Sequence, residues 1–243
     1  MIHLSYDPKL QLPTSEQLPH SDDTPVDNEL QNDIPNFILN LLRRIWEGKQ
    51  DWFFGVDMAI HYNAGTPAIV PDGFLALGVP RHKSEGGRLS YVLWEEANIM
   101  PILALEVISE TYNSEYEKKL TTYQEMGVLY YIVYNPLTTK KRAYKDRLPL
   151  EIYQLVNGEY VLLSDRQQEI VWLEQIQLGL GCEVRENTGW TREWLYLYDR
   201  TGKRYLTDKE TAEQERLAKE KAEQKAQRLA EKLRSLGLDP DEV

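Results

Sequence analysis

Apolar positions in the first quarter of the chain recur at helical spacing. The spacing predicts a helix from about Glu29 or Ile34 to Glu47, with Gly48 directly after it. Asp33 can cap the later start, and Pro35 would then lie in the first turn. The apolar face consists of Phe37, Ile38, Leu41, Leu42, Ile45 and Trp46.

Short apolar or alternating runs follow, and these predict strands at 52–62, 67–78, 91–94 and 102–109. The run at 102–109, ILALEVIS, is almost continuously apolar, which is typical of a central strand covered on both faces. Its single charged residue is Glu106.

A strand, a helix and a second strand occupy residues 102 to 136. The segment 111–128 has Tyr116, Leu120, Tyr123 and Met126 on one face, which predicts a helix ending at Gly127. Residues 129–136, LYYIVYNP, form another buried strand. This length fits a right-handed crossover between parallel strands.

The C-terminal half reads as hairpins followed by a charged helix. Residues 150–155 and 160–164 flank a glycine-containing turn, and 170–184 contain one or two more strands. The sequences WLYLYD and KRYL, joined by Arg200-Thr201-Gly202, predict a closing hairpin at the sheet edge. From Lys209 to Leu236 the composition is that of a solvated helix. Its apolar residues recur at coiled-coil spacing over two heptads, and we call this row the apolar seam: Ala222, Ala226, Leu229, Leu233 and Leu236. The seam would also allow a weak coiled coil or contact with a partner helix.

The length of 243 residues and the 42% hydrophobic content fit one domain with tails. We expect an irregular leader at 1–27, a domain at 28–206 and a charged helical tail at 207–243. The sequence has no apolar run long enough for a membrane span and no signal-peptide pattern. The lone Cys182 excludes an intramolecular disulfide and a cysteine-based zinc cluster. These features predict a cytoplasmic protein.

The net charge of −11 is unevenly distributed. Residues 1–34 carry seven acidic side chains and one basic one, whereas 35–205 carry 22 and 19. The central part is therefore near neutral, and charge neither supports nor excludes a DNA substrate. A basic cluster could face phosphates, although a solvated hairpin loop explains it as well; it comprises Lys140, Lys141, Arg142, Lys145 and Arg147.

The residues with candidate chemistry lie between Val70 and Val133. Asp72 follows Pro71 at the edge of one strand, and Glu106 lies inside another. Mg²⁺ takes oxygen ligands such as these carboxylates, to which the backbone carbonyl of Val107 or Ile108 could add a further oxygen. Lys118 or Lys119, on the following helix, could return over the strand end and stabilise charge on a phosphate.

The alternative interpretation is structural. Glu106 could be the buried ion-pair partner of a lysine, and Asp72 only a turn residue. Glu29 could add a metal ligand or simply begin a solvated helix, and Asp57 could face the same cleft or solvent. His61 fits a strand end better than a general base, and no phosphate-binding glycine loop or Ser-His-Asp order is present.

The segments VPDGF, ILALEVIS, EKKLTTYQEMGVLYYIVYNP and GWTREWLYLYD, in this order and spacing, resemble a known family. It is the "putative restriction endonuclease" family of the PD-(D/E)XK nuclease superfamily, abundant in cyanobacteria, and the resemblance covers about residues 25–206. It implies an α/β fold, a restriction-endonuclease-like mixed β-sheet flanked by helices, and a magnesium-dependent nuclease site. By position, Asp72 and Glu106 match the acidic residues. Ile108 stands where the superfamily has its lysine, and the resemblance places that lysine at Lys119 on the helix.

The resemblance therefore implies an endonuclease that hydrolyses DNA phosphodiester bonds with Mg²⁺ or Mn²⁺. The alternative is a catalytically inactive nuclease fold that binds DNA or protein. A third interpretation is a structural homo-oligomer organised by the C-terminal helix.

Overall fold

The computed structural model describes residues 12–20, 28–109, 114–138, 142–144, 146–187 and 189–236. The chain divides into two compact units, Met1–Arg204 and Tyr205–Val243. Lys140, Lys141 and Lys145 of the predicted basic cluster lie outside the described residues.

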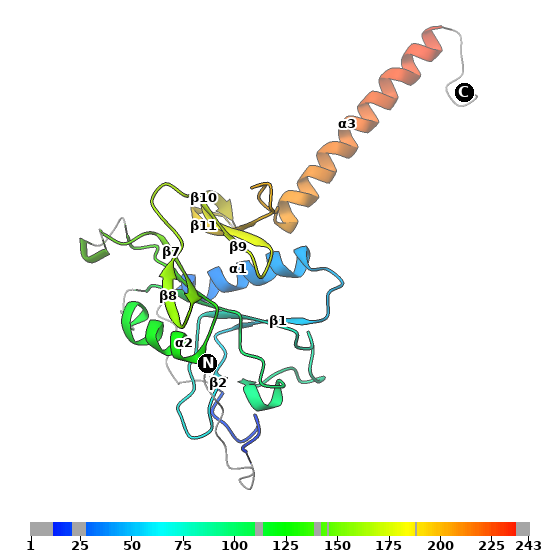
Figure 1. Ribbon diagram of the computed structural model, residues 1–243. Coiled ribbons are helices and arrows are strands. Elements are labelled where there is room, and N and C mark those ends of the chain that lie inside the picture. The colour runs from blue at the N-terminus through cyan, green and yellow to red at the C-terminus, as the bar shows by residue number, and fades with distance from the viewer. Residues whose placement is uncertain are drawn as a thin grey trace. The chain divides into compact units, whose positions relative to one another are not determined.

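A six-stranded sheet forms the centre of the first unit (Figure 1). Its neighbours β5 and β6 are parallel and are connected through α2, whereas all other neighbouring strands are antiparallel. The mixed α/β fold expected from the sequence is thus confirmed. In spatial order the strands are β1 (Trp52–Val56), β3 (Gly73–Leu77), β5 (Leu103–Val107), β6 (Tyr130–Tyr134), β7 (Leu150–Val156) and β8 (Glu159–Leu162).

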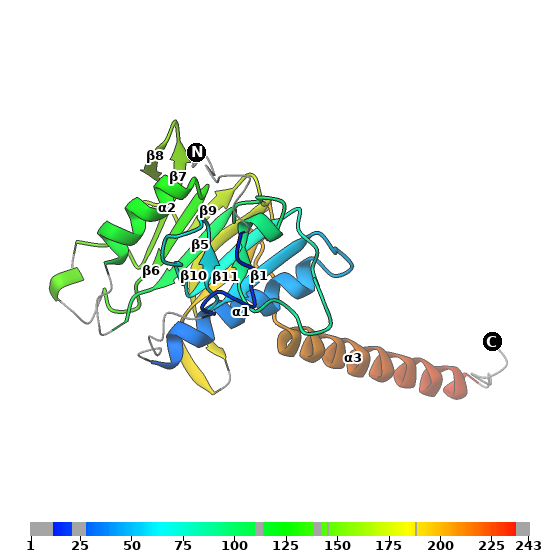
Figure 2. The ribbon, with the colours of Figure 1, turned by 90° about the horizontal axis from the view of Figure 1, so that it is seen from below.

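Helices α1 (Glu29–Ile45) and α2 (Leu120–Met126) cover opposite faces of this sheet, as Figures 1 and 2 show. Side chains alternate between the two faces along a strand. On β3, Phe74 belongs to the core cluster that contains Tyr123 of α2, whereas a side-chain carbon at Gly73 would lie 3.3 Å from Cβ of Pro35 on α1. A π-helical segment, Glu115–Lys119, leads directly into α2.

A three-stranded antiparallel sheet lies against α1. It consists of β9 (Ile170–Leu173), β10 (Leu178–Asn187) and β11 (Trp190–Tyr198), in the order β11-β10-β9. The ring of Phe37 on α1 packs 5.5 Å from Trp194 and 5.1 Å from Tyr196 of β11, measured between centroids. The remaining strands that the structure describes form a small parallel pair, β2 (Ile60–His61) and β4 (Tyr91–Val92). Two short 3-10 helices lie at Leu93–Glu95 and Arg142–Tyr144.

Three predictions about local structure are wrong. The predicted strand 52–62 is interrupted at Asp57, whose φ of 47° lies in the left-handed region and ends β1. The segment WLYLYD pairs with β10 instead of KRYL; only an isolated bridge joins Tyr198 to Arg204. Of the two starts predicted for the first helix, the structure has the one at Glu29, and only the cap at Asp33 is wrong, because the Asn28 side chain accepts the hydrogen bond from the Leu30 N–H.

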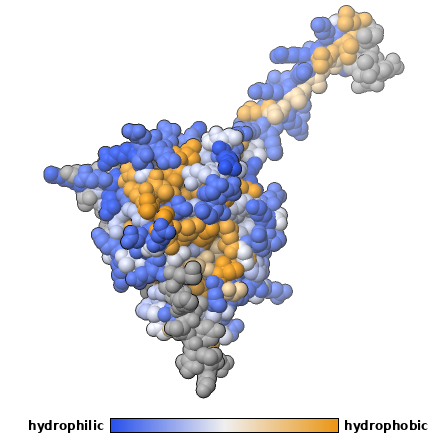
Figure 3. Space-filling model, viewed as in Figure 1, coloured by the Kyte–Doolittle hydropathy of each residue, from blue (hydrophilic) through white to orange (hydrophobic). Residues whose placement is uncertain are grey.

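The described residues of the second unit, 205–236, contain one helix, α3 (Asp208–Ser235). Thr207 and Glu210 form a reciprocal capping box at its start. None of its side chains is buried, and its surface is mostly hydrophilic with separate apolar positions (Figure 3). Within the described part of the chain, no helix combines the length and apolar character needed to cross a membrane.

Candidate active site

The two candidate carboxylates lie opposite each other on adjacent strands. In the antiparallel pair β3–β5, Gly73 pairs with Leu105 and Phe74 with Ala104. One step further, this register places Asp72 opposite Glu106. Side chains directly opposite each other in an antiparallel pair point to the same face, with Cβ atoms about 5 Å apart. Asp72 and Glu106 therefore both project toward the face that α2 covers.

Glu106 is the most deeply buried charged residue of this site, with 1% of its surface exposed. Its Oε2 accepts a hydrogen bond from Lys119 Nζ at 2.7 Å, and its Oε1 accepts one from the Tyr123 hydroxyl at 2.8 Å. An isolated carboxylate would be strongly destabilising at this depth, and these two donors compensate for the lost water. The expected ion pair between Glu106 and a lysine is present.

Asp72 is anchored to the same strand end. Its Oδ2 accepts a hydrogen bond from the backbone N–H of Val107 at 2.6 Å. Burial and the neighbouring charge of Glu106 raise the pKa of Asp72 well above its ordinary value of 3.8, against the opposing effects of the Val107 N–H and Lys119. Two carboxyl groups in one low-dielectric site resist ionising together. A bound cation would remove that resistance.

The donor set suits a hard divalent ion. Carboxylate oxygens of Asp72 and Glu106 and the backbone carbonyl of Val107 are oxygen donors of the kind that Mg²⁺ prefers, with water and substrate oxygens completing its shell. The described residues contain no group of three or more His, Cys, Asp or Glu side chains arranged to hold a metal ion. Any site here would therefore depend on the backbone carbonyl, on water and on the substrate for its remaining ligands.

Lys119 remains a cation. Burial by itself would lower the pKa of Lys119, but Glu106, Asp72 and Glu115 more than offset this, and the pKa is raised. The adjacent Lys118 is exposed and has no contact with Glu106. Both lysines line a cavity of about 460 Å³ that also borders residues 67–70, just before Asp72. The structure thus brings Lys119 to the carboxylates and leaves Lys118 at the rim of the neighbouring cavity.

Two further residues belong to this cluster. Glu115 is 3% exposed and acts electrostatically on both Asp72 and Lys119. Tyr123 is fully buried, and burial together with Glu106 raises the pKa of its hydroxyl well above 10.0, so it stays a hydrogen-bond donor. Glu115, Lys119 and Tyr123 are spaced four residues apart, which places them on one helical face. That spacing is the signal in the sequence that could have identified Glu115.

The other candidates, Glu29, Asp57 and His61, differ in their surroundings. Glu29 is exposed in the first turn of α1. Asp57 is exposed, and its backbone N–H donates to the Asp72 carbonyl at 3.2 Å. The Nε2 of His61 lies 2.8 Å from the Pro19 carbonyl, which is a structural contact.

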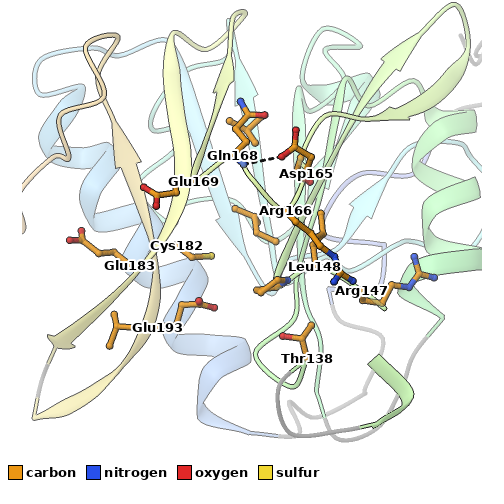
Figure 4. A pocket seen from close by; sticks show the side chains of 15 residues that line it. Thr138, Arg147, Leu148, Asp165, Arg166, Gln168, Glu169, Cys182, Glu183 and Glu193 are labelled. Carbon is orange, nitrogen blue, oxygen red and sulfur yellow. Dashed lines mark hydrogen bonds between the residues drawn. The ribbon is translucent and has the colours of Figure 1, made fainter. Parts of the chain in front are cut away.

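Another cavity, of about 660 Å³, lies elsewhere, between the start of β7, the segment 164–169 and strands β10 and β11 (Figure 4). Arg147 of the predicted basic cluster lines it, pairs with Glu151 and stacks on Tyr116. Burial raises the pKa of both Cys182 and Glu193 at its wall. The lining includes four acidic side chains, so this cavity is a poor match for a polyanion; they are Asp165, Glu169, Glu183 and Glu193.

The first unit is thus a mixed α/β domain with a carboxylate pair and a lysine at the end of its central strands. The chain belongs to the family described as "Uma2: Putative restriction endonuclease", whose profile matches residues 21–185. Among solved structures it is similar to a "putative nuclease belonging to DUF820 from Anabaena variabilis ATCC 29413". That likeness has a TM-score of 0.44 and 11% sequence identity, and covers 67% of this chain and 90% of the other. No curated protein matches the sequence.

Proposed function

We propose that this protein is an endonuclease that hydrolyses DNA phosphodiester bonds with the help of Mg²⁺ or Mn²⁺. The observation that carries the proposal is the juxtaposition of Asp72 and Glu106 across β3 and β5, with Lys119 bonded to Glu106 at 2.7 Å. Family membership is consistent with it.

Each residue of the site would have its own role in phosphodiester hydrolysis. Asp72, Glu106 and the Val107 carbonyl would hold a divalent ion, which when bound supplies charge neutralisation and an acidified water. Tyr123 and Lys119 fix the orientation of the Glu106 carboxylate. Lys119, protonated and at the border of the cavity, would also donate to a phosphate oxygen and stabilise negative charge that develops there. The Val107 N–H holds the Asp72 carboxylate at the strand end through Oδ2.

The direct test is cleavage of supercoiled plasmid and of single-stranded DNA with Mg²⁺ or Mn²⁺. We expect activity from the native protein and at least a hundredfold loss in Asp72→Asn and Glu106→Gln, the order of effect of removing one charge-stabilising group. Glu193→Gln is the matched control, because it neutralises a partly buried carboxyl group on β11, away from the site. Calorimetric titration with Mn²⁺ should show binding that both site variants lose.

The second candidate function is a nuclease fold that binds DNA or protein without cleaving. It is favoured by the saturation of Glu106: both of its oxygens already have donors within the protein, so a metal ion would have to displace or share one. If cleavage is equally low in the native protein and in both site variants, and no metal binding is detected, this second function replaces the first.

A further inference from the structure

A smaller cavity, of about 280 Å³, lies along the outer edge of β1. One flank of α1 and the segment 81–88 form its other walls. We call it the edge groove. No Asp or Glu is among the residues that line it, although the chain as a whole carries a net charge of −11. Its basic lining residues are Arg43, Arg81, Lys83 and Arg88, with His82 beside them.

One end of the edge groove lies at the turn after β1, next to the strand β3 that Asp72 precedes; Asp72 and Glu106 themselves do not line it. Val56 and Met58 line this end, and they flank Asp57, whose N–H donates to the Asp72 carbonyl. On α1, Asn36 lines the same end and follows Pro35, the residue that approaches Gly73. Arg43 is seven residues further along α1, a distance of about 10 Å. Figures 1 and 2 show α1 and β1 running side by side.

The cationic end is held in place by the fold. The Arg81 N–H donates to the Gln50 carbonyl at 2.8 Å, which fixes the segment 81–88 beside the start of β1. The Arg81 guanidinium lies 4.2 Å from the centroid of the Trp52 ring, and that of Arg88 lies 4.3 Å from the Phe53 ring. These stacking contacts orient the guanidinium groups before any ligand binds, which lowers the entropy lost on binding.

Two of the four cations lack a counterion. Arg88 and Lys83 pair with Glu96 at 2.9 and 3.0 Å, and Lys83 also pairs with Glu95. Within the part of the chain that the structure describes, neither Arg43 nor Arg81 has a carboxylate partner. Burial and the nearby charges of Arg43 and Arg88 lower the pKa of Arg81. An anion between these guanidinium groups would relieve their mutual repulsion.

We propose that the edge groove binds phosphates of the DNA substrate on one side of the cleavage position. The inference rests on the proposed function, which it extends by naming where the flanking strand lies. The roughly 10 Å between the two ends corresponds to about three phosphates at 3.4 Å of helix rise per nucleotide. Arginine suits this role because its planar donors match phosphate oxygens two at a time.

The test measures binding without cleavage, in a Glu106→Gln background with EDTA present. A fluorescein-labelled DNA duplex is titrated by anisotropy between 50 and 200 mM KCl, with Arg43→Gln/Arg81→Gln beside it. Each lost phosphate contact should reduce the slope of log K against log salt by about 0.9. Between 50 and 200 mM KCl, the Glu106→Gln protein (the parent) should thus lose roughly tenfold more affinity than the same protein carrying Arg43→Gln/Arg81→Gln. Arg166→Gln/Arg200→Gln, which removes two exposed arginines outside the groove, is the matched control and should keep the parent slope.

Equal slopes for the parent and the Arg43/Arg81 variant would overturn the inference, as would a parent that does not bind the duplex. If Arg81→Gln disturbs the fold, Arg43→Gln alone still tests the groove, because this side chain is exposed on the helix and glutamine is an equally good helix former. Tighter binding of an RNA duplex of the same sequence would contradict the assignment to DNA. Groove-dependent binding without any cleavage by the native protein would refute only the nuclease function.

Discussion

Replacing Lys119 with methionine probes the buried ion pair at the centre of the candidate site. The exchange keeps side-chain length and helix propensity but removes the charge that compensates Glu106. The side chain of Glu106 is 1% exposed and that of Lys119 is 18% exposed, so solvent can replace little of the lost interaction. Breaking a buried pair from one side costs about 3–5 kcal/mol. We expect the lower end, about 3 kcal/mol, because Tyr123 still donates to Oε1.

The assay is thermal and urea unfolding followed by circular dichroism in EDTA. For a unit of this size, 3 kcal/mol corresponds to a decrease in Tm of about 6–12 °C. Lys118→Met is the matched control: it makes the same exchange one residue earlier, at an exposed position, and should change the free energy of unfolding by less than about 0.5 kcal/mol.

A double-mutant cycle separates the pair from its surroundings. Lys119→Met combined with Glu106→Gln removes both charges, so the double variant should be more stable than the sum of the two single effects predicts, by at least about 2 kcal/mol. Additivity within about 0.5 kcal/mol would refute the reasoning, because it would mean that the two side chains do not depend on each other energetically.

Three further outcomes are expected. In EDTA, the raised pKa of Asp72 should make the free energy of unfolding depend on pH: its contribution is fully present below the pKa of the unfolded chain, near 3.8, and is lost as the pH rises through the native pKa. In urea unfolding at several pH values, Asp72→Asn should therefore show a smaller loss of stability with rising pH, and an equal loss would contradict the assignment. Gly73→Ala would place Cβ 2.9 Å from Cζ of Phe54, so we expect the free energy of unfolding in urea to fall by about 1–3 kcal/mol. Cleavage should also decrease, because the adjacent Asp72 would be displaced. Unchanged stability would show that the Phe54 ring moves aside without cost. We also propose that the apolar seam of α3 joins two or more copies of the chain; light scattering should then give the full-length protein a mass above that of one chain and Leu229→Glu/Leu233→Glu the mass of one, and equal masses would exclude this role.

The sequence predicted the parts of the site that depend on local pattern. The apolar run 102–109 indicates a buried central strand, and β5 is buried throughout with Glu106 inside it. The strand-helix-strand spacing predicts a parallel crossover, and β5 and β6 pair in parallel. These features follow from one strand or one helix at a time, because burial and period are properties of a short segment.

Other features could not be read from any one segment. The strand ends at Asp57 because this residue has a left-handed φ, which the local sequence does not predict. The predicted closing hairpin is wrong because β11 pairs along its whole length with β10. The edge groove collects its cations from α1 and from a segment about 40 residues later. Which strands pair, and which side chains from distant segments meet, depends on non-local contacts, and the periodicity of a single segment does not predict these.

For the candidate site itself, the sequence alone determined that Asp72 and Glu106 lie at strand positions and that a lysine pair follows on a helix. Only the tertiary structure decided that the β3–β5 register sets the two carboxylates opposite each other and that Lys119 rather than Lys118 reaches Glu106. It also decided that Glu115 and Tyr123 join them. The physical reason is that a buried charge must be compensated within the folded protein, and the compensating groups come from whichever elements packing brings within hydrogen-bond distance.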